Sequence, residues 1–356
     1  MRTRALALLL VLTLLLPAFT PGCTEDEDPG QYTTINDMAD RQVKVPQDVG
    51  SAVGIGPGAL RLMVYLGHTD KVVGVEDVEK TDPIRPYIMA HPELRNLPTI
   101  GPMHGGDAEL IVAADPDIIF WTYTTADDAN ELQEKTGIPV VVLVYGDLDD
   151  QTDNFFRALE LVEEVMGSGQ NVEQQIQDTI QELSSLAENI PEENRSSLYV
   201  GGIGYKGTQG LLSTEPAFSS FGFLGLESVA ADIGQDHAFI DKEQLLEWDP
   251  KIIFVDEGGL EPVMDELESD EAYQDLQAVQ NGTIYGLLPY NWYTTNVGTL
   301  LANSYYLLSI LAPEEFSLEE AELKADEIYL QLVGYKVYGE MKETFGGFKE
   351  LELDRS

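Results

Sequence analysis

One phrase of sequence occurs twice in this chain. Residues 107–120 read DAELIVAADPDIIF and residues 241–254 read DKEQLLEWDPKIIF, so the two segments align without gaps. The identical positions are Asp107/Asp241, Glu109/Glu243, Asp115/Asp249, Pro116/Pro250, Ile118/Ile252, Ile119/Ile253 and Phe120/Phe254. A match of this kind at two places predicts two structural units built on the same plan.

Each copy predicts a short helix followed by a buried strand. The leading Asp107 or Asp241 suits an N-cap, where a carboxylate accepts hydrogen bonds from the first free amides of a helix. The Asp-Pro step ends the helix, because the residue before proline is pushed out of the helical region. The Ile-Ile-Phe run that follows is typical of a strand buried on both faces of a parallel sheet.

The surrounding sequence extends this pattern to two α/β lobes. A second turn and strand follow each copy, at residues 136–144 and 281–288. Between the copies, residues 171–189 carry apolar side chains at helical spacing. We therefore expect two Rossmann-like lobes, residues 36–168 and 191–356, joined by a long rigid helix over 169–190, with a ligand cleft between the lobes. Further helices are expected at 299–311 and 318–333.

The N-terminus is typical of an export signal. Arg2 and Arg4 precede an apolar stretch of twelve residues, Ala5 to Leu16, which is too short to span a bilayer. Gly22-Cys23 then resembles a lipobox, although Thr20 stands where leucine is usual. We expect residues 1–23 to be a signal peptide with Cys23 as the lipidation site and residues 24–35 to be an acidic tether. The protein is expected to be extracytoplasmic, anchored to the outer face of the cytoplasmic membrane.

The charge of the chain excludes some partners. Its 63 acidic and 20 basic residues give a formal net charge of -43. Phosphate groups would be repelled over the whole surface, so nucleic acid is not expected as a partner. Acidic residues scattered along a chain with few lysines are also typical of adaptation to high salt. Cys23 is the sole cysteine, so no internal disulfide can form.

The order of these features resembles the helix-linked (class III) solute-binding proteins of ABC importers, which deliver iron chelates and cobalamin. The resemblance rests on the phrase of residues 38–45 (MADRQVKV), on residues 56–62 (GPGALRL), on the two Asp-Pro-strand units, on the linker helix and on residues 289–296 (PYNWYTTN). It implies a binding protein without enzymatic activity or cofactor. A ferric chelate is the first ligand implied, a corrinoid the second and molybdate or tungstate the third.

The resemblance also implies how the protein meets its permease dimer. Members of this family dock through one acidic side chain in each lobe, on the helix that precedes the Pro-strand unit. Glu109 and Glu243 occupy those positions and are identical partners in the repeat. Paired with arginines, two such carboxylates would fix orientation and encounter rate. The alternative is that they are ordinary solvated acids.

Loops at strand ends are the usual ligand position in open α/β sheets. Aromatic walls with a few hydrogen-bond donors suit a bulky chelate, and scarce cations would meet an anionic one. The candidate ligand residues are Gly56, Pro57, Gly58, Arg61, Trp121, Tyr123, Thr124, Tyr205, Lys206, Tyr290, Trp292 and Tyr293. For Trp121 and Trp292, a place in the core or the lobe interface is the alternative interpretation.

Enzymatic alternatives have weaker support. Residues 202–207 fit the pattern GxGxxG of dinucleotide enzymes, but Gly210 and Pro216 forbid the long helix that should follow. The histidines, His68, His91, His104 and His237, form no metal-binding pair at close spacing, so no direct metal site is expected. A stacked-β surface protein is disfavoured by the α/β alternation.

Overall fold

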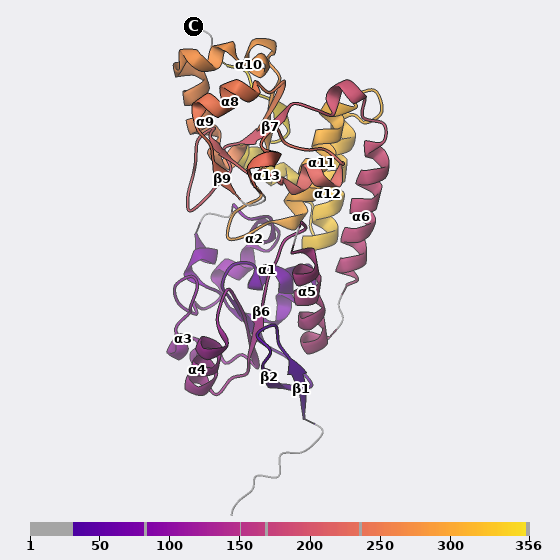
Figure 1. Cartoon of the computed structure of the whole chain (residues 1–356). Helices are drawn as coiled ribbons and strands as arrows, with labels where there is room; N and C mark the ends of the chain where they lie inside the picture. The colour runs from indigo at the N-terminus through magenta and orange to yellow at the C-terminus, as the bar shows by residue number, and fades with distance from the viewer. Residues whose placement is uncertain (1–30, 82–83, 150, 168–169, 235–236, 354–356) are drawn as a thin grey trace, which may run out of the picture.

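The computed structural model describes residues 31–81, 84–149, 151–167, 170–234 and 237–353. These residues form two α/β lobes, one above the other in Figure 1, each with its own four-stranded sheet. The two copies of the repeated phrase lie in different sheets, which confirms the predicted two-lobed α/β fold. The predicted signal peptide and Cys23 lie outside the described residues.

The N-terminal lobe is built around the parallel sheet β4-β3-β5-β6, with a separate hairpin formed by β1 and β2. Its elements are β1 (Tyr32–Asn36), β2 (Gln42–Pro46), β3 (Ala52–Ile55), α1 (Ala59–Tyr65), β4 (Val72–Gly74), α2 (Pro86–Ala90), α3 (Ala108–Ala114), β5 (Ile118–Thr122), α4 (Ala126–Thr136), β6 (Val140–Leu143) and α5 (Thr152–Met166). The start of β1 at Tyr32 shortens the predicted acidic tether, whose last residues belong to the hairpin.

The C-terminal lobe repeats this plan in the sheet β12-β11-β10-β7, in which only β12 is antiparallel to its neighbour. Its elements are β7 (Leu198–Gly201), β8 (Ser213–Thr214), α7 (Ser219–Phe223), β9 (Ala238–Phe239), α8 (Lys242–Trp248), β10 (Ile252–Asp256), α9 (Leu260–Ser269), α10 (Gln277–Asn281), β11 (Ile284–Leu287), α11 (Val297–Leu311), α12 (Leu318–Val333), α13 (Tyr338–Phe345) and β12 (Lys349–Glu350). Strands β8 and β9 form a separate antiparallel pair.

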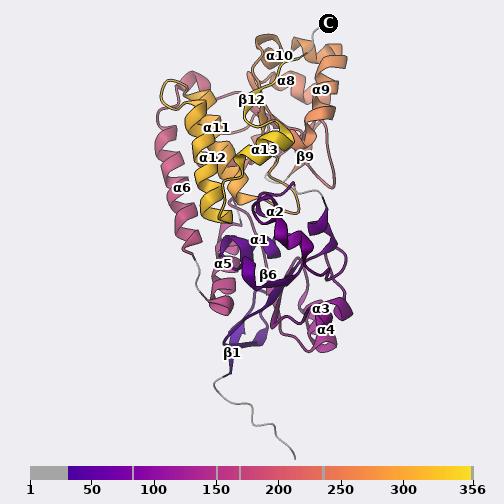
Figure 2. The same cartoon turned by 180° about the vertical axis from the view of Figure 1, so that it is seen from behind.

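In chain order, the two lobes are connected by α6 (Val172–Ala187). This helix lies alongside α11 and α12 in both views (Figures 1 and 2). Short 3₁₀ helices lie at Thr69–Lys71, Asp77–Lys80, Pro92–Asn96, Glu192–Asn194, Ala231–Ile233, Glu257–Gly259 and Glu271–Asp275. The lobe boundaries drawn from the sequence remain a prediction, but a helix runs over most of the expected connecting segment.

The repeated phrase folds as its residues predict. The carboxylate of Asp107 accepts hydrogen bonds from the amides of Glu109 and Leu110 at the start of α3, and Asp241 accepts one from Gln244 at the start of α8. Asp115 and Asp249 end these helices in the left-handed conformation, with φ of 54° and 42°. Aspartate tolerates the left-handed conformation better than most residues do. The left-handed C-cap and the proline that follows it therefore end each helix together.

One hydrophobic cluster crosses from lobe to lobe. It contains Leu62 and Leu143 of the N-terminal lobe together with Leu300 and Leu332 of the C-terminal lobe. Helices α1 and α2 of the first lobe contact α12 of the second. Burial of apolar surface therefore contributes to holding the lobes together on this side of the molecule. No helix in the described ranges is both long and apolar enough to cross a membrane.

Candidate ligand-binding site

The site lies where loops after the parallel strands of the two lobes meet. Several side-chain hydrogen bonds cross directly from lobe to lobe here. Among them are Tyr123 Oη to Thr294 Oγ1 at 3.0 Å, Tyr293 Oη to Glu76 Oε2 at 2.7 Å, Arg61 Nη1 to the Thr295 carbonyl at 2.7 Å, and Tyr145 Oη to the same carbonyl at 2.9 Å. Ligands of open α/β sheets bind at the carboxyl ends of strands, so this junction is the candidate site.

The glycine-rich loop after β3 is shaped by close contacts. Gly56 and Gly58 both have positive φ, 84° and 88°. A Cβ atom at Gly58 would lie 2.2 Å from the ring of Tyr145, so only glycine fits there. The Pro57 carbonyl accepts a hydrogen bond from Thr122 Oγ1. The amide of Gly56, one of the candidate ligand residues, donates to the carboxylate of Glu76.

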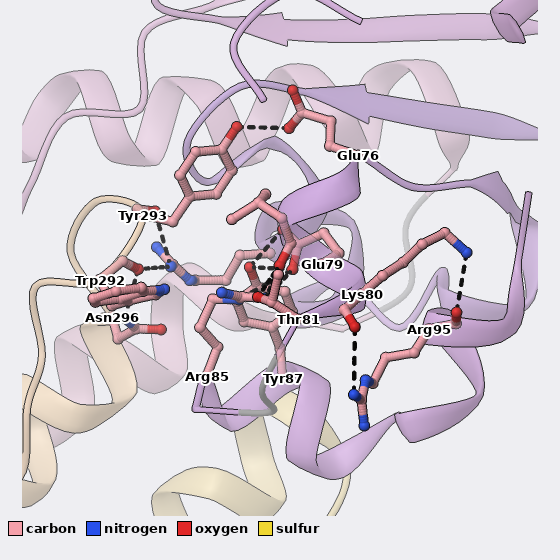
Figure 3. A network of polar contacts seen from close by, with 12 residues as sticks. Glu76, Glu79, Lys80, Thr81, Arg85, Tyr87, Arg95, Trp292, Tyr293 and Asn296 are labelled. Carbon is pink, nitrogen blue, oxygen red and sulfur yellow. Dashed lines mark hydrogen bonds and ion pairs between the residues drawn. The ribbon is translucent and has the colours of Figure 1, made fainter. Parts of the chain in front are cut away.

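Glu76 is an internal anion at the centre of the site. It follows β4 and is buried, and its carboxylate accepts hydrogen bonds from the amides of Gly56 and His104. A third hydrogen bond comes from the hydroxyl of Tyr293, as Figure 3 shows. Burial raises the pKa of Glu76 to about 7, against the opposite effect of these three hydrogen bonds. Sequence reasoning missed Glu76, although its position just after the valine-rich residues 72–75 could have suggested it.

Arg61 is fully buried between the lobes. Its guanidinium donates to the carbonyls of Trp292, Tyr293 and Thr295 and to the hydroxyl of Tyr145. No carboxylate of the described residues lies within ion-pair distance of it. Arg61 was predicted to meet a charged ligand, but here its Nη groups are occupied by protein acceptors. Arg85, another scarce cation, pairs with the buried Glu79 at 3.0 Å (Figure 3).

Residues at the end of β5 and just after it lie in different environments. Trp121 is only 9% exposed and packs with Ile111 and Leu132 in the hydrophobic cluster beneath α3 and α4. Tyr123, by contrast, is 64% exposed and reaches the other lobe. The hydroxyl of Thr124 is buried without a hydrogen-bond partner among the described residues. Of the predicted residues here, Tyr123 is the one with a ring available to a ligand.

The loop after β11, which carries Trp292 and Tyr293, supplies the part of the site that belongs to the C-terminal lobe, its C-terminal wall. Trp292 is 42% exposed, whereas Tyr290 is buried against Phe218 with ring centroids 5.5 Å apart. The hydroxyl of Tyr293 donates to Glu76, and the centroid of its ring lies 5.5 Å from that of His104. The structure therefore brings Trp292 and Tyr293 to the junction and places Tyr290 in the core.

The loop after β7 adjoins this wall. The side-chain amide of Asn291 donates to the carbonyl of Gly204 at 3.0 Å. The exposed ring of Tyr205 stacks on His237 at 4.3 Å, nearly parallel, and Lys206 Nζ lies 5.2 Å from the Tyr205 ring centroid. Lys206 forms no ion pair with the described residues, so its charge is available to an anion.

A separate hollow opens between the lobes beside α7. It has a volume of about 390 Å³ and is lined by Leu148 and Asp149 of the N-terminal lobe and by residues of the 216–234 segment, among them Phe218 and Phe221. Glu215 immediately precedes that segment, and burial together with the charges of Asp147, Asp149 and Asp256 raises its pKa to about 8. This end of the junction is acidic, in contrast to the end that carries Lys206.

The two predicted docking residues are matched in structure as well as in sequence. Glu109 lies in the first turn of α3 and Glu243 in the first turn of α8, and both side chains are exposed. Acidic residues in a first helical turn are also stabilised by the helix dipole. Their location is compatible with docking and with ordinary solvation, so the docking role stays a proposal.

The described residues contain no group of three or more His, Asp, Glu or Cys side chains that could hold a metal ion. His237, beside the loop after β7, instead bonds Ser213 Oγ through Nε2 at 2.7 Å and stacks on Tyr205.

Two lobes with facing strand-end loops define a solute-binding fold, and comparisons with known proteins agree. The sequence model of the periplasmic binding protein family matches residues 54–290, and the chain belongs to that family. Among curated proteins, the molybdate-binding protein MolA of Haemophilus influenzae is 22% identical over 316 residues, which cover 83% of this chain and 89% of that protein.

Solved structures show the same fold. MolA bound to molybdate superposes with a TM-score of 0.66 at 21% identity, covering 85% of this chain and 98% of that one. A periplasmic solute-binding protein of Veillonella parvula gives 0.69 at 17% identity, covering 88% and 96%. The petrobactin-binding protein YclQ of Bacillus subtilis gives 0.57 at 17% identity, covering 79% and 98%.

Proposed function

We propose that this chain is the extracytoplasmic binding protein of an ABC importer and that it captures an anionic metal complex, with a ferric siderophore-type chelate as the first candidate. The observation that carries the proposal is the set of exposed aromatic rings on adjoining loops of both lobes. Tyr123 of one lobe and Trp292 and Tyr205 of the other are 64%, 42% and 41% exposed. Such rings suit the large, partly apolar surface of a chelate.

The cation beside these rings supports an anionic ligand. Lys206 contacts the ring of Tyr205 and no carboxylate among the described residues. In a chain with 63 acidic and 20 basic residues, an unpaired lysine at this position is the natural partner for a negative charge.

Molybdate or tungstate is the second candidate. A curated relative, MolA, is named for molybdate binding. The hydroxyls of Tyr123 and Thr294 lie 3.0 Å apart between the lobes, and that of Thr124 is buried with no hydrogen-bond partner in the part of the chain that the structure describes. Hydroxyl donors at this spacing suit a small tetrahedral oxyanion, and a small ligand would demand little separation of the lobes. A corrinoid fits less well, because no specific observation favours it.

A ligand screen by thermal denaturation tests these assignments. Mature protein in high salt is heated with a ferric catecholate, a ferric hydroxamate, cobalamin, haem, molybdate and tungstate. A ligand at 100 times its dissociation constant should stabilise the protein by about 2.7 kcal/mol. Lys206→Ala should weaken binding of the anion about tenfold, whereas Lys336→Ala, which removes an exposed lysine between α12 and α13, should not. If no compound stabilises the protein, or if one is chemically converted, the proposal is wrong.

We also propose that Cys23 carries the lipid anchor. The Gly22-Cys23 pair after an apolar stretch supports it. In the native host, Cys23→Ser should release mature protein into the medium, and mass spectrometry of the wild-type N-terminus should show a lipid-modified cysteine. Recovery of unmodified wild-type protein from the membrane-free fraction would contradict the anchor.

A further inference from the structure

The turn that carries Trp292 is strained. Residues 291 and 295 close it as an antiparallel bridge, and two of the three residues between them, Tyr293 and Thr294, have φ of 53° and 63°. Two consecutive positive φ values are the requirement of a type I′ turn, which strongly favours Asn-Gly. Tyrosine and the β-branched threonine are poor residues for it, so other contacts must hold the turn in this shape.

Most of those contacts come from the opposite lobe. The guanidinium of Arg61 donates to the carbonyls of Trp292 and Tyr293 at 3.1 Å each and to that of Thr295 at 2.7 Å. Tyr145 donates to the Thr295 carbonyl as well. Within its own lobe, the turn is held by Asn296, whose side chain donates to the carbonyls of Tyr290 and Trp292.

Arg61 depends on the turn in return. Its side chain is 0% exposed and has no carboxylate partner among the described residues; besides the three carbonyls it contacts the rings of Tyr87 and Tyr145. A buried cation without such acceptors is strongly destabilising. Separation of the lobes would remove the carbonyls from Arg61 and the restraint from the turn in a single step.

We propose that Arg61 is a positioning residue that sets the shape of the 291–295 turn, so that Trp292 and Tyr293 take their ligand-facing orientation only while the lobes are in contact. The C-terminal wall of the site is thus assembled by the N-terminal lobe. The inference rests on the proposed function only in calling that wall ligand-facing; the coupling between Arg61 and the turn is independent of any ligand.

Hydrogen exchange of the ligand-free protein tests the coupling. In Arg61→Lys, which keeps the charge but cannot reach three carbonyls in a plane, a peptide covering residues 290–296 should exchange at least tenfold faster than in wild type. A peptide covering β10 should be unchanged, and so should both peptides in Arg157→Lys, an exposed arginine of α5. Equal acceleration in β10, or no acceleration in the turn, would overturn the proposal.

A second substitution separates positioning from general loss of stability. Glycine reaches positive φ without strain, so Thr294→Gly should let the turn keep its shape without Arg61. In the Arg61→Lys background it should restore at least half of the lost protection, and failure to do so would contradict the role of strain.

A spectroscopic measurement covers the case in which Arg61→Lys does not fold. In protein with Trp121→Phe and Trp248→Phe, Trp292 is the remaining indole. Tyr293→Phe removes one contact across the lobes, and should raise iodide quenching of Trp292 about twofold. Unchanged quenching in this variant would count against the proposal. Because no ligand enters these experiments, their failure is distinct from failure of the ligand screen.

Discussion

The hydroxyl of Tyr293 donates a hydrogen bond of 2.7 Å to the buried carboxylate of Glu76, 217 positions earlier in the chain. Burial, followed by the charge of Glu76, raises the pKa of Tyr293 well above its ordinary value, so the phenol stays a donor at neutral pH. This contact joins the lobes at the candidate site.

Replacing Tyr293 by phenylalanine should destabilise the protein by about 1–3 kcal/mol, because it leaves a buried carboxylate with one donor fewer. Urea denaturation of the ligand-free protein measures this change. Tyr335→Phe, at a position 56% exposed, is the control and should have little effect. Equal stability of the Tyr293 variant and wild type would show that the bond contributes nothing to folding.

The stability of the protein should fall as pH rises from about 4.5 to 7. Burial raises the pKa of Glu76 from 4.5 to about 7, so the folded protein holds this proton more tightly than the unfolded chain does. Its favourable contribution is complete below pH 4.5 and is lost as pH rises through 7. Each unit of pKa difference corresponds to about 1.4 kcal/mol.

Glu76→Gln should therefore flatten part of this pH profile, measured by denaturation at constant salt. Asp256 and Glu257, also buried, have pKa values raised to about 7 and 8, mainly by burial, so some slope with the same sign should remain. Glu188→Gln, at an exposed position, should leave the profile unchanged. A Glu76→Gln profile parallel to that of wild type would refute the assignment.

Ligand binding should change the fluorescence of Trp292 and leave that of Trp121 nearly constant. Trp292 is half-exposed at the junction, whereas Trp121 is enclosed by the cluster under α3 and α4. With any ligand found in the screen, Trp292→Phe should abolish most of the signal and Trp121→Phe should retain it. The opposite pattern would move the site to the other face of β5.

Substituting both Glu109 and Glu243 by alanine should lower importer stimulation at least tenfold and leave ligand affinity unchanged, because both acids are exposed in helices α3 and α8. The paired change Glu134→Ala with Glu247→Ala removes the same charge from exposed positions and should be neutral. A loss of ligand affinity in the first variant would place these glutamates in the site.

Local pattern was enough to predict the fold of this chain. Residues 171–189 have the apolar spacing of a helix, and α6 occupies 172–187. Each repeated phrase has an N-capping Asp and a β-branched run, and each folds as helix and strand in its own sheet. These features depend on neighbours a few residues apart, so the sequence carries them directly.

Site residues were harder to predict, since their roles depend on which surfaces face each other. Tyr123, Lys206 and Trp292 were expected from their loops and are exposed at the junction. Arg61 was expected to be open to a ligand and is enclosed by the opposite lobe. Trp121 was a candidate for the ligand wall, with a place in the core as the alternative, and it lies in a core two positions before the exposed Tyr123.

The sequence by itself determined two α/β lobes, the connecting helix and the loops at the strand ends, because periodicity, capping and proline act over short stretches of chain. Only the tertiary structure decided which donor meets which acceptor. The contacts of Arg61 and Glu76 with the 291–295 turn join residues more than two hundred positions apart. Such contacts follow from how two separately folded surfaces pack, and no local pattern specifies that packing.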